Sequence, residues 1–109
     1  MNQEEMLELR NEELCDLSHA TARYLAASPL EKINLAAAAG KEWNPIASTE
    51  QAMHLAALMN MTICFGGMVV MVSEPDGTQS RTVEYKLNRR TEALRKAITL
   101  LAADFAQHI

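Results

Sequence analysis

The chain has 109 residues, of which 49% are hydrophobic, and its 10 basic residues stand against 14 acidic ones for a formal net charge of −4. This composition predicts one domain with a sizeable hydrophobic core, and the acidic balance argues against a protein that coats DNA or RNA. The two cysteines, Cys15 and Cys64, are too few for a disulfide framework, the first residues are acidic, and no apolar run is long enough to span a bilayer, so we expect a cytoplasmic protein.

The first forty residues predict two helices. Asn11 is followed by two glutamates, and acidic side chains in a first turn oppose the positive end of the helix dipole, so we expect a helix over residues 11–27. Ser28-Pro29-Leu30-Glu31 combines an N-cap, a first-turn proline and a capping glutamate, which predicts a second helix that ends at Gly40. The face of the first helix expected to be buried consists of Leu14, Leu17, Thr21, Tyr24 and Leu25.

Residues 41–47 form a connector that holds the only tryptophan, Trp43. A lone indole in a connector most often anchors it, so we expect Trp43 to be partly buried where the two halves of the chain meet. Ser48-Thr49-Glu50-Gln51 is a capping-box pattern, which predicts a third helix that runs to about Met59.

The hydrophobic period then changes from 3.6 to 2, which predicts three strands in an antiparallel meander. The runs are Met61–Phe65, Met68–Val72 and Thr82–Leu87, with a two-residue turn at Gly66-Gly67 and a second turn at Glu74–Gly77. Because the middle run is apolar at every position, we expect the middle strand to be covered on both faces of the sheet.

The last helix is predicted from about Asn88 to about Gln107, with apolar residues on one face. The order α-α-α-β-β-β-α predicts an α+β fold in which a three-stranded antiparallel meander is sandwiched by helices. We expect a single domain over residues 1–109, with N-terminal helices in residues 1–40 and a helix, three strands and a helix in residues 48–107. The helices at 48–59 and 88–107 are expected on one face of the sheet and the N-terminal helices on the other.

Three stretches suggest a family. Trp43-Asn44-Pro45 leads into Ser48–Ala52, Pro75-Asp76-Gly77 divides the strands, and the closing segment Thr91–Ile98 has alanines four residues apart. From Trp43 to about Phe105 this order resembles the small phage and prophage proteins grouped as the phage ABA-sandwich domain. The resemblance implies an accessory protein of a phage or prophage that acts in the bacterial cytoplasm. That group has no assigned chemistry, so it assigns no functional residue.

Few residues suggest catalysis or metal binding. Cys15 and His19 are four apart on a helix, and His54 and Cys64 are the remaining candidates for a zinc site. Two ligands on one helix without a second closely spaced pair are weak evidence, so we favour a buried thiol and a surface imidazole and expect no metal or cofactor. No signature pairs a cysteine nucleophile with a base, so we expect a protein that is not an enzyme.

The charge distribution supplies the candidate site. Residues 81–96 hold six basic residues and two acidic ones, whereas residues 1–50 are acidic. An ordinary solvated surface is the alternative explanation for such a run. Because guanidinium groups bind phosphate and carboxylate through paired hydrogen bonds, we expect a convergent anion-binding rim. Its residues are Arg81, Arg89, Arg90 and Arg95.

The leading functional hypothesis is a non-enzymatic phage or prophage accessory protein that binds a host protein or a small anionic ligand. The alternative is a secretion-type chaperone that binds a partner polypeptide, since a methionine-rich sheet containing Met61, Met68 and Met71 adapts to varied sequences. Apolar residues spread over both sheet faces also predict a homodimer or higher oligomer.

Overall fold

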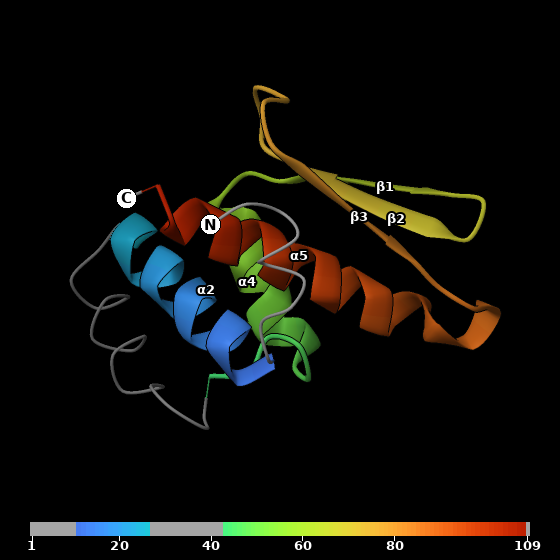
Figure 1. The fold of residues 1–109 in the computed structure, drawn as a ribbon, viewed down its shortest axis with the longest axis horizontal. Helices are drawn as coiled ribbons and strands as arrows, with labels where there is room; N and C mark the ends of the chain where they lie inside the picture. Colours follow the sequence, from blue (N-terminus) through green and yellow to red (C-terminus); the bar gives the residue numbers. More distant parts are fainter. Residues whose placement is uncertain (1–10, 27–42, 109) are drawn as a thin grey trace.

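The structure, a computed structural model, describes residues 11–26 and 43–108. Three α-helices, a 3-10 helix and three strands make up this part of the chain (Figure 1). The predicted helix over 28–40 lies outside the described residues. In chain order the elements are α2 (Asn11–Leu25), α4 (Thr49–Leu58), β1 (Thr62–Gly66), β2 (Val69–Ser73), β3 (Ser80–Glu84), η2 (Leu87–Arg89) and α5 (Arg90–Ala106).

Helix α2 packs along α5 through small residues. Ser18, Thr21 and Ala22 are buried, and Thr21 Oγ1 donates a hydrogen bond of 2.6 Å to the carbonyl oxygen of Ala102 on α5. Tyr24 is 64% exposed, so the predicted buried face was wrong at this position. Small side chains let the two helix backbones approach closely, and this contact turns the bulky tyrosine outward.

Helix α4 begins and ends with the local bonds that its sequence favours. Ser48 Oγ accepts from the N–H of Gln51 at 3.2 Å, which confirms the predicted N-cap. At the other end, Asn60 has φ of 51°, and the N–H of Met61 donates to the carbonyl oxygen of Ala56 at 2.9 Å. A left-handed residue with this bond is the Schellman arrangement, which stops the helix and turns the chain into β1.

The strands form one antiparallel sheet in the order β1-β2-β3, so the α+β class and the meander are confirmed. Gly66 pairs with Val69, which makes Gly67 and Met68 the two central turn residues, with φ of 48° and 64°. Positive φ at both positions is the type I′ geometry that suits the twist of a hairpin. The turn therefore lies one residue later than predicted and places a methionine in a conformation that L residues rarely adopt.

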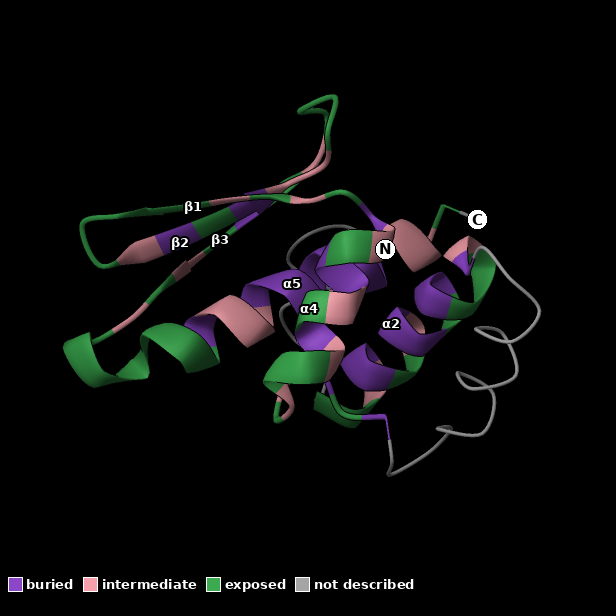
Figure 2. Ribbon diagram, turned by 180° about the vertical axis from the view of Figure 1, so that it is seen from behind, coloured by how far each residue is buried: buried purple, intermediate pink, exposed green. Residues whose placement is uncertain are grey.

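Among the described elements, helices cover only one face of the sheet. Val70 and Val72 are fully buried, whereas Met71 between them is 40% exposed, so the expectation of two covered faces for the middle strand was wrong (Figure 2). Helices α4 and α5 lie on the covered side, and α2 packs on α5 rather than on the opposite face of the sheet (Figure 1). An apolar run alone does not show two covered faces, because a methionine tolerates exposure where no element packs on it.

Helix α5 is the centre of the described fold. Every residue from Ala97 to Asp104 is buried, because α2, α4 and the sheet all pack around this stretch. Its first turns are different: residues 87–92 are exposed and extend beyond the other helices (Figures 1 and 2). The protruding start of α5 and the end of β3 together border the candidate site.

Candidate binding groove

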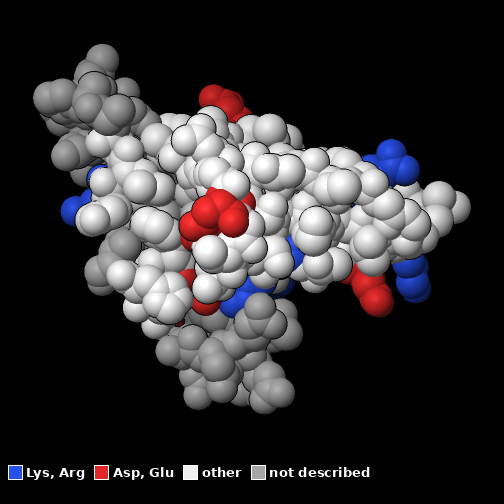
Figure 3. All heavy atoms as spheres, turned by 90° about the horizontal axis from the view of Figure 1, so that it is seen from above, with Lys and Arg blue, Asp and Glu red and all other residues white. Residues whose placement is uncertain are grey.

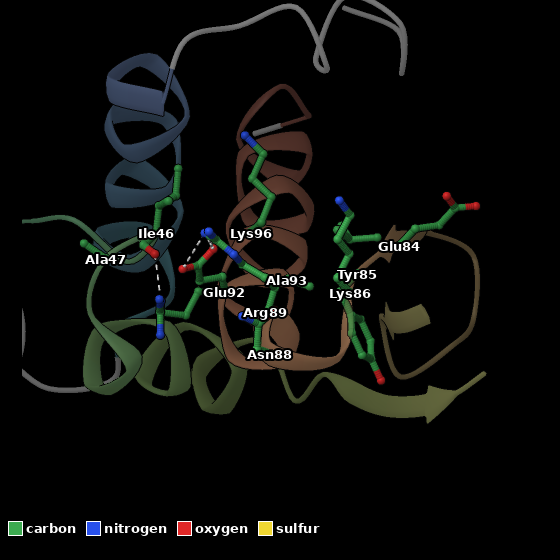
Figure 4. A pocket seen from close by; sticks show the side chains of 12 residues that line it. Ile46, Ala47, Glu84, Tyr85, Lys86, Asn88, Arg89, Glu92, Ala93 and Lys96 are labelled. Carbon is green, nitrogen blue, oxygen red and sulfur yellow. Dashed lines mark hydrogen bonds and ion pairs between the residues drawn. The ribbon is translucent and has the colours of Figure 1, made fainter. Parts of the chain in front are cut away.

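An open groove of about 1090 Å³ runs along the first half of α5. Residues 83–86, at and after the end of β3, form one wall, and the turn at residues 46–47 forms the other (Figure 4). Side chains of η2 and α5 between residues 88 and 96 form the floor. Two segments far apart in the sequence, residues 46–47 and residues 83–96, therefore build this one concave surface.

The groove has an excess of positive charge in an otherwise acidic protein. Its basic residues are Lys86, Arg89, Arg95 and Lys96, and its acidic residues are Glu84 and Glu92. Subtracting two negative charges from four positive ones leaves a formal charge of +2, compared with −4 for the whole chain. Concave surfaces of one sign concentrate the opposite charge, so anionic groups are drawn to this site.

Uncharged acceptors hold two of the four basic side chains in place. Arg95 Nε donates to the carbonyl oxygen of Ile46 at 2.7 Å, and its Nη1 donates to Thr49 Oγ1 at 3.0 Å. Lys96 Nζ donates to Asn11 Oδ1 at 3.0 Å. These bonds restrict the side chains without neutralising them, so both keep their full charge for a ligand.

Arg89 is the ion-paired member of the groove. Its Nη1 lies 2.9 Å from Glu92 Oε2, one turn along the chain, and both side chains are more than half exposed (Figure 4). Exposed pairs of this kind contribute little to stability because water and salt screen them. A ligand carboxylate therefore competes for Arg89 at low energetic cost.

The four arginines of the predicted rim do not converge. Arg81 is 6% exposed and pairs with Asp104 at 3.3 Å beneath the sheet, so its predicted place on a surface rim was wrong. Arg90 lies over the rings of Phe65 and Tyr85, with its Cζ 5.9 Å from each centroid. Arg81 follows the inward alternation of β3, and a buried carboxylate on α5 receives it.

The structure places Arg89 and Arg95 in the groove, together with Lys86 and Lys96. The two lysines were not part of the predicted rim, which contained arginines only. The signal for Lys96 was present, because it lies seven residues after Arg89 and therefore on the same helical face. Lys86 lies two residues after the end of β3, so its position on the wall depends on the path of the chain between β3 and η2. Both lysines belong to the basic run that the sequence shows.

The wall made by β3 is a free sheet edge. The N–H of Tyr85 donates to the carbonyl oxygen of Met68 at 2.9 Å, which sets the hydrogen-bonding phase of the β2–β3 ladder. Bonded and non-bonded pairs alternate along antiparallel strands, so Thr82 and Glu84 direct their backbone groups away from β2. Outside that ladder the described residues make no backbone hydrogen bond to either residue. An extended chain beside β3 therefore finds unpaired donors and acceptors.

Cys15 and His19 lie together near the connector, and both are buried, so the expected buried thiol is confirmed and the expected surface imidazole was wrong. Cys64 lies on the exposed side of the sheet. Burial raises the pKa of the Cys15 thiol, and Cys15 Sγ lies 3.4 Å from Asn44 Oδ1. Within residues 11–26 and 43–108, no group of three or more His, Cys, Asp or Glu side chains is placed to hold a metal ion. These contacts give the thiol a packing role next to Trp43, whose ring lies 5.3 Å from that of His19.

Trp43 is 4% exposed, and its Nε1 donates to Ser18 Oγ at 3.1 Å. The predicted anchoring of the connector is confirmed, and burial is more complete than expected. Trp43 joins the connector to α2 and so helps to place the turn at 46–47 that forms one wall of the groove.

Comparison with known proteins finds no family model, no curated protein and no solved structure that matches this chain. In the part of the chain that the structure describes, no helix is both long and apolar enough to cross a membrane.

Proposed function

We propose that this protein is a non-enzymatic binding protein whose groove takes an acidic, extended segment of a partner polypeptide. The observation that carries the proposal is the combination of a free strand edge with an excess of positive charge in one groove. Added strands gain main-chain hydrogen bonds along such an edge, and charged walls select the side chains of the guest. The resemblance to phage ABA-sandwich proteins favours a phage or prophage setting, in which the partner is a host protein.

The features of the groove favour a polypeptide over a small anion. Its basic side chains come from the wall at residues 83–86 and from the floor, and none of the described contacts gathers them around a single point. The edge of β3 offers backbone groups at Glu84, which lines the groove, and at Thr82 just outside it, two residues apart, which matches the repeat of an extended chain. A small anion uses only one or two of the cations and gains nothing from the strand edge.

A secretion-type chaperone is the second candidate. Met53, Met68 and Met71 are each at least 40% exposed, and flexible thioethers suit surfaces that receive varied sequences. A chaperone of this kind binds partner segments through these methionines and needs no charge selectivity.

The test is fluorescence anisotropy with a labelled peptide that alternates glutamate with valine, measured at low and high salt. A peptide with lysine in place of glutamate serves as its counterpart. We expect the acidic peptide to bind and the basic one not to bind, with affinity that falls as salt rises, because screening weakens attraction between exposed charges. Equal binding of both peptides favours the chaperone, and displacement by inorganic phosphate favours a small-anion site.

Two charge reversals localise the binding. Lys86→Glu changes the groove wall, and Arg23→Glu makes the same change on the exposed last turn of α2, outside the groove. We expect Lys86→Glu to weaken binding of the acidic peptide about tenfold or more, which corresponds to about 1.4 kcal/mol, and Arg23→Glu to change it much less. Equal losses in the two variants contradict the proposal, because they reflect net charge alone.

A further inference from the structure

Strand β1 forms the opposite edge of the sheet and lacks the usual protection of an edge strand. Its sequence is Thr-Ile-Cys-Phe-Gly, with no charge and no proline, and four of its five residues are exposed. Among the described elements, β1 packs mainly on β2. On its helix side Ile63 is partly buried against the core and Arg90 lies over the ring of Phe65, while its outer edge meets no other strand of the described sheet. Edge strands in monomeric proteins normally carry charged residues, proline or a covering element, because a bare edge pairs with other chains.

The register shows which backbone groups of β1 point outward. The carbonyl oxygen of Met68 accepts a hydrogen bond from Tyr85, on the β3 side. Because the direction alternates along a strand, Val69, Met71 and Ser73 direct their backbone groups towards β1. Their partners on β1 are Gly66, Cys64 and Thr62. The N–H and C=O groups of Ile63 and Phe65 therefore face away from the sheet.

The outward groups are symmetric about Cys64, which is the middle residue of the strand. When a second copy of β1 lies antiparallel with a twofold axis at Cys64, Ile63 pairs with Phe65 of the second copy and all five positions are matched. The bonded pairs then fall on the residues whose backbone groups point outward. The isologous symmetry of a dimer requires this kind of self-matching surface.

We propose that β1 pairs with β1 of a second copy of this chain, with the twofold axis at Cys64, to form one continuous six-stranded sheet. On the helix side, the 46% exposed ring of Phe65 contacts Ile63 of the second copy, an aromatic and β-branched pair that stabilises antiparallel strands. On the open side, Cys64 lies opposite its own counterpart. No like charges meet across the axis, because β1 carries none.

The distribution of charge also favours β1 over β3 as the edge that pairs with a second copy. The open side of the sheet carries one charged residue, Glu84, which lies on β3 at the far edge from β1. Figure 3, seen from the sheet side, shows uncharged atoms over most of this surface, a group of acidic side chains near its middle and basic side chains at the end where α5 begins. A second copy is thus accommodated at β1 without approaching the charged groove, and the inference does not depend on the proposed function.

Sedimentation velocity at micromolar concentration tests the pairing with two matched proline variants. Ile63→Pro removes an outward N–H from β1, and Thr82→Pro removes an outward N–H from β3, so neither breaks a bond of the β1–β2–β3 ladder. We expect twice the monomer mass for the parent and for Thr82→Pro, and the monomer mass for Ile63→Pro.

A second pair of variants keeps the test independent of proline tolerance. Cys64→Lys places two ammonium groups opposite each other at the axis on the exposed face, and Cys64→Ser keeps the position neutral. We expect the lysine variant to be monomeric and the serine variant to stay dimeric. A monomeric parent protein, or a dimer that survives both Ile63→Pro and Cys64→Lys, overturns the proposal.

Discussion

The ion pair between Arg81 and Asp104 lies between the sheet and α5, and its two side chains are 5% and 8% exposed. With Arg81 Nη2 at 3.3 Å from Asp104 Oδ1 and an effective dielectric constant of about 20, the Coulomb attraction is about 5 kcal/mol. Removing each charge from water costs several kcal/mol, and neither Nε nor Nη2 of Arg81 has a hydrogen-bond partner to offset this cost. The pair as a unit is therefore close to neutral, while either charge alone in this place is strongly unfavourable.

Asp104→Ala should lower the free energy of unfolding by about 3–5 kcal/mol, because it leaves the guanidinium of Arg81 buried without a counter-charge. That is a large part of the roughly 5–15 kcal/mol that holds a typical domain folded. Replacing both partners, as in Arg81→Met with Asp104→Leu, should restore stability to within about 1 kcal/mol of the parent or exceed it. The exposed pair supplies the control: Glu92→Gln, which removes the partner of Arg89, should cost less than about 1 kcal/mol.

Urea unfolding followed by circular dichroism measures these differences in unfolding free energy. The slope of the unfolding free energy against urea concentration should be the same for all variants, which checks that the unfolded state has not changed. A loss below about 1 kcal/mol for Asp104→Ala would refute the reasoning, because it would mean that water reaches the guanidinium. A double variant as unstable as the single variant would refute it equally, since the site would then require the charges themselves.

Three further predictions follow from local features. Met68→Asn should raise the free energy of unfolding by about 1 kcal/mol in urea titrations, because asparagine tolerates the left-handed conformation of this turn position better than methionine; an unchanged midpoint contradicts this. Trp43 fluorescence should shift to longer wavelength on unfolding, and Trp43→Phe should cost about 1–2 kcal/mol by removing the bond to Ser18. Because burial raises the pKa of Cys15 in the folded state, its contribution to stability is complete below the unfolded pKa of about 8.5 and is lost as pH rises through the folded value. Cys15→Ala should flatten that alkaline decline, measured as unfolding free energy between pH 7 and pH 10.

The sequence determined the features that depend on neighbours a few residues apart. Ser48 caps α4 through the N–H of Gln51, three residues on, and the period-2 pattern identifies three strands with two tight turns. Trp43 was correctly expected to be buried, because a large indole is costly to leave in water. Such features need only local hydrogen bonds and the size of one side chain, so residue order contains enough information to find them.

The tertiary structure decided which surfaces meet. Thr21 bonds to Ala102 across 81 positions, and this helix contact determines that Tyr24 points outward. In the sequence, nothing distinguishes Arg81 from the surface arginines. The structure shows that Asp104 on α5 lies beneath it and pairs with it. The groove likewise requires α5 to hold the turn at 46–47 opposite the end of β3. Charge patterns along the chain show where cations are abundant, but burial and pairing between distant segments decide which of them remain available to a ligand.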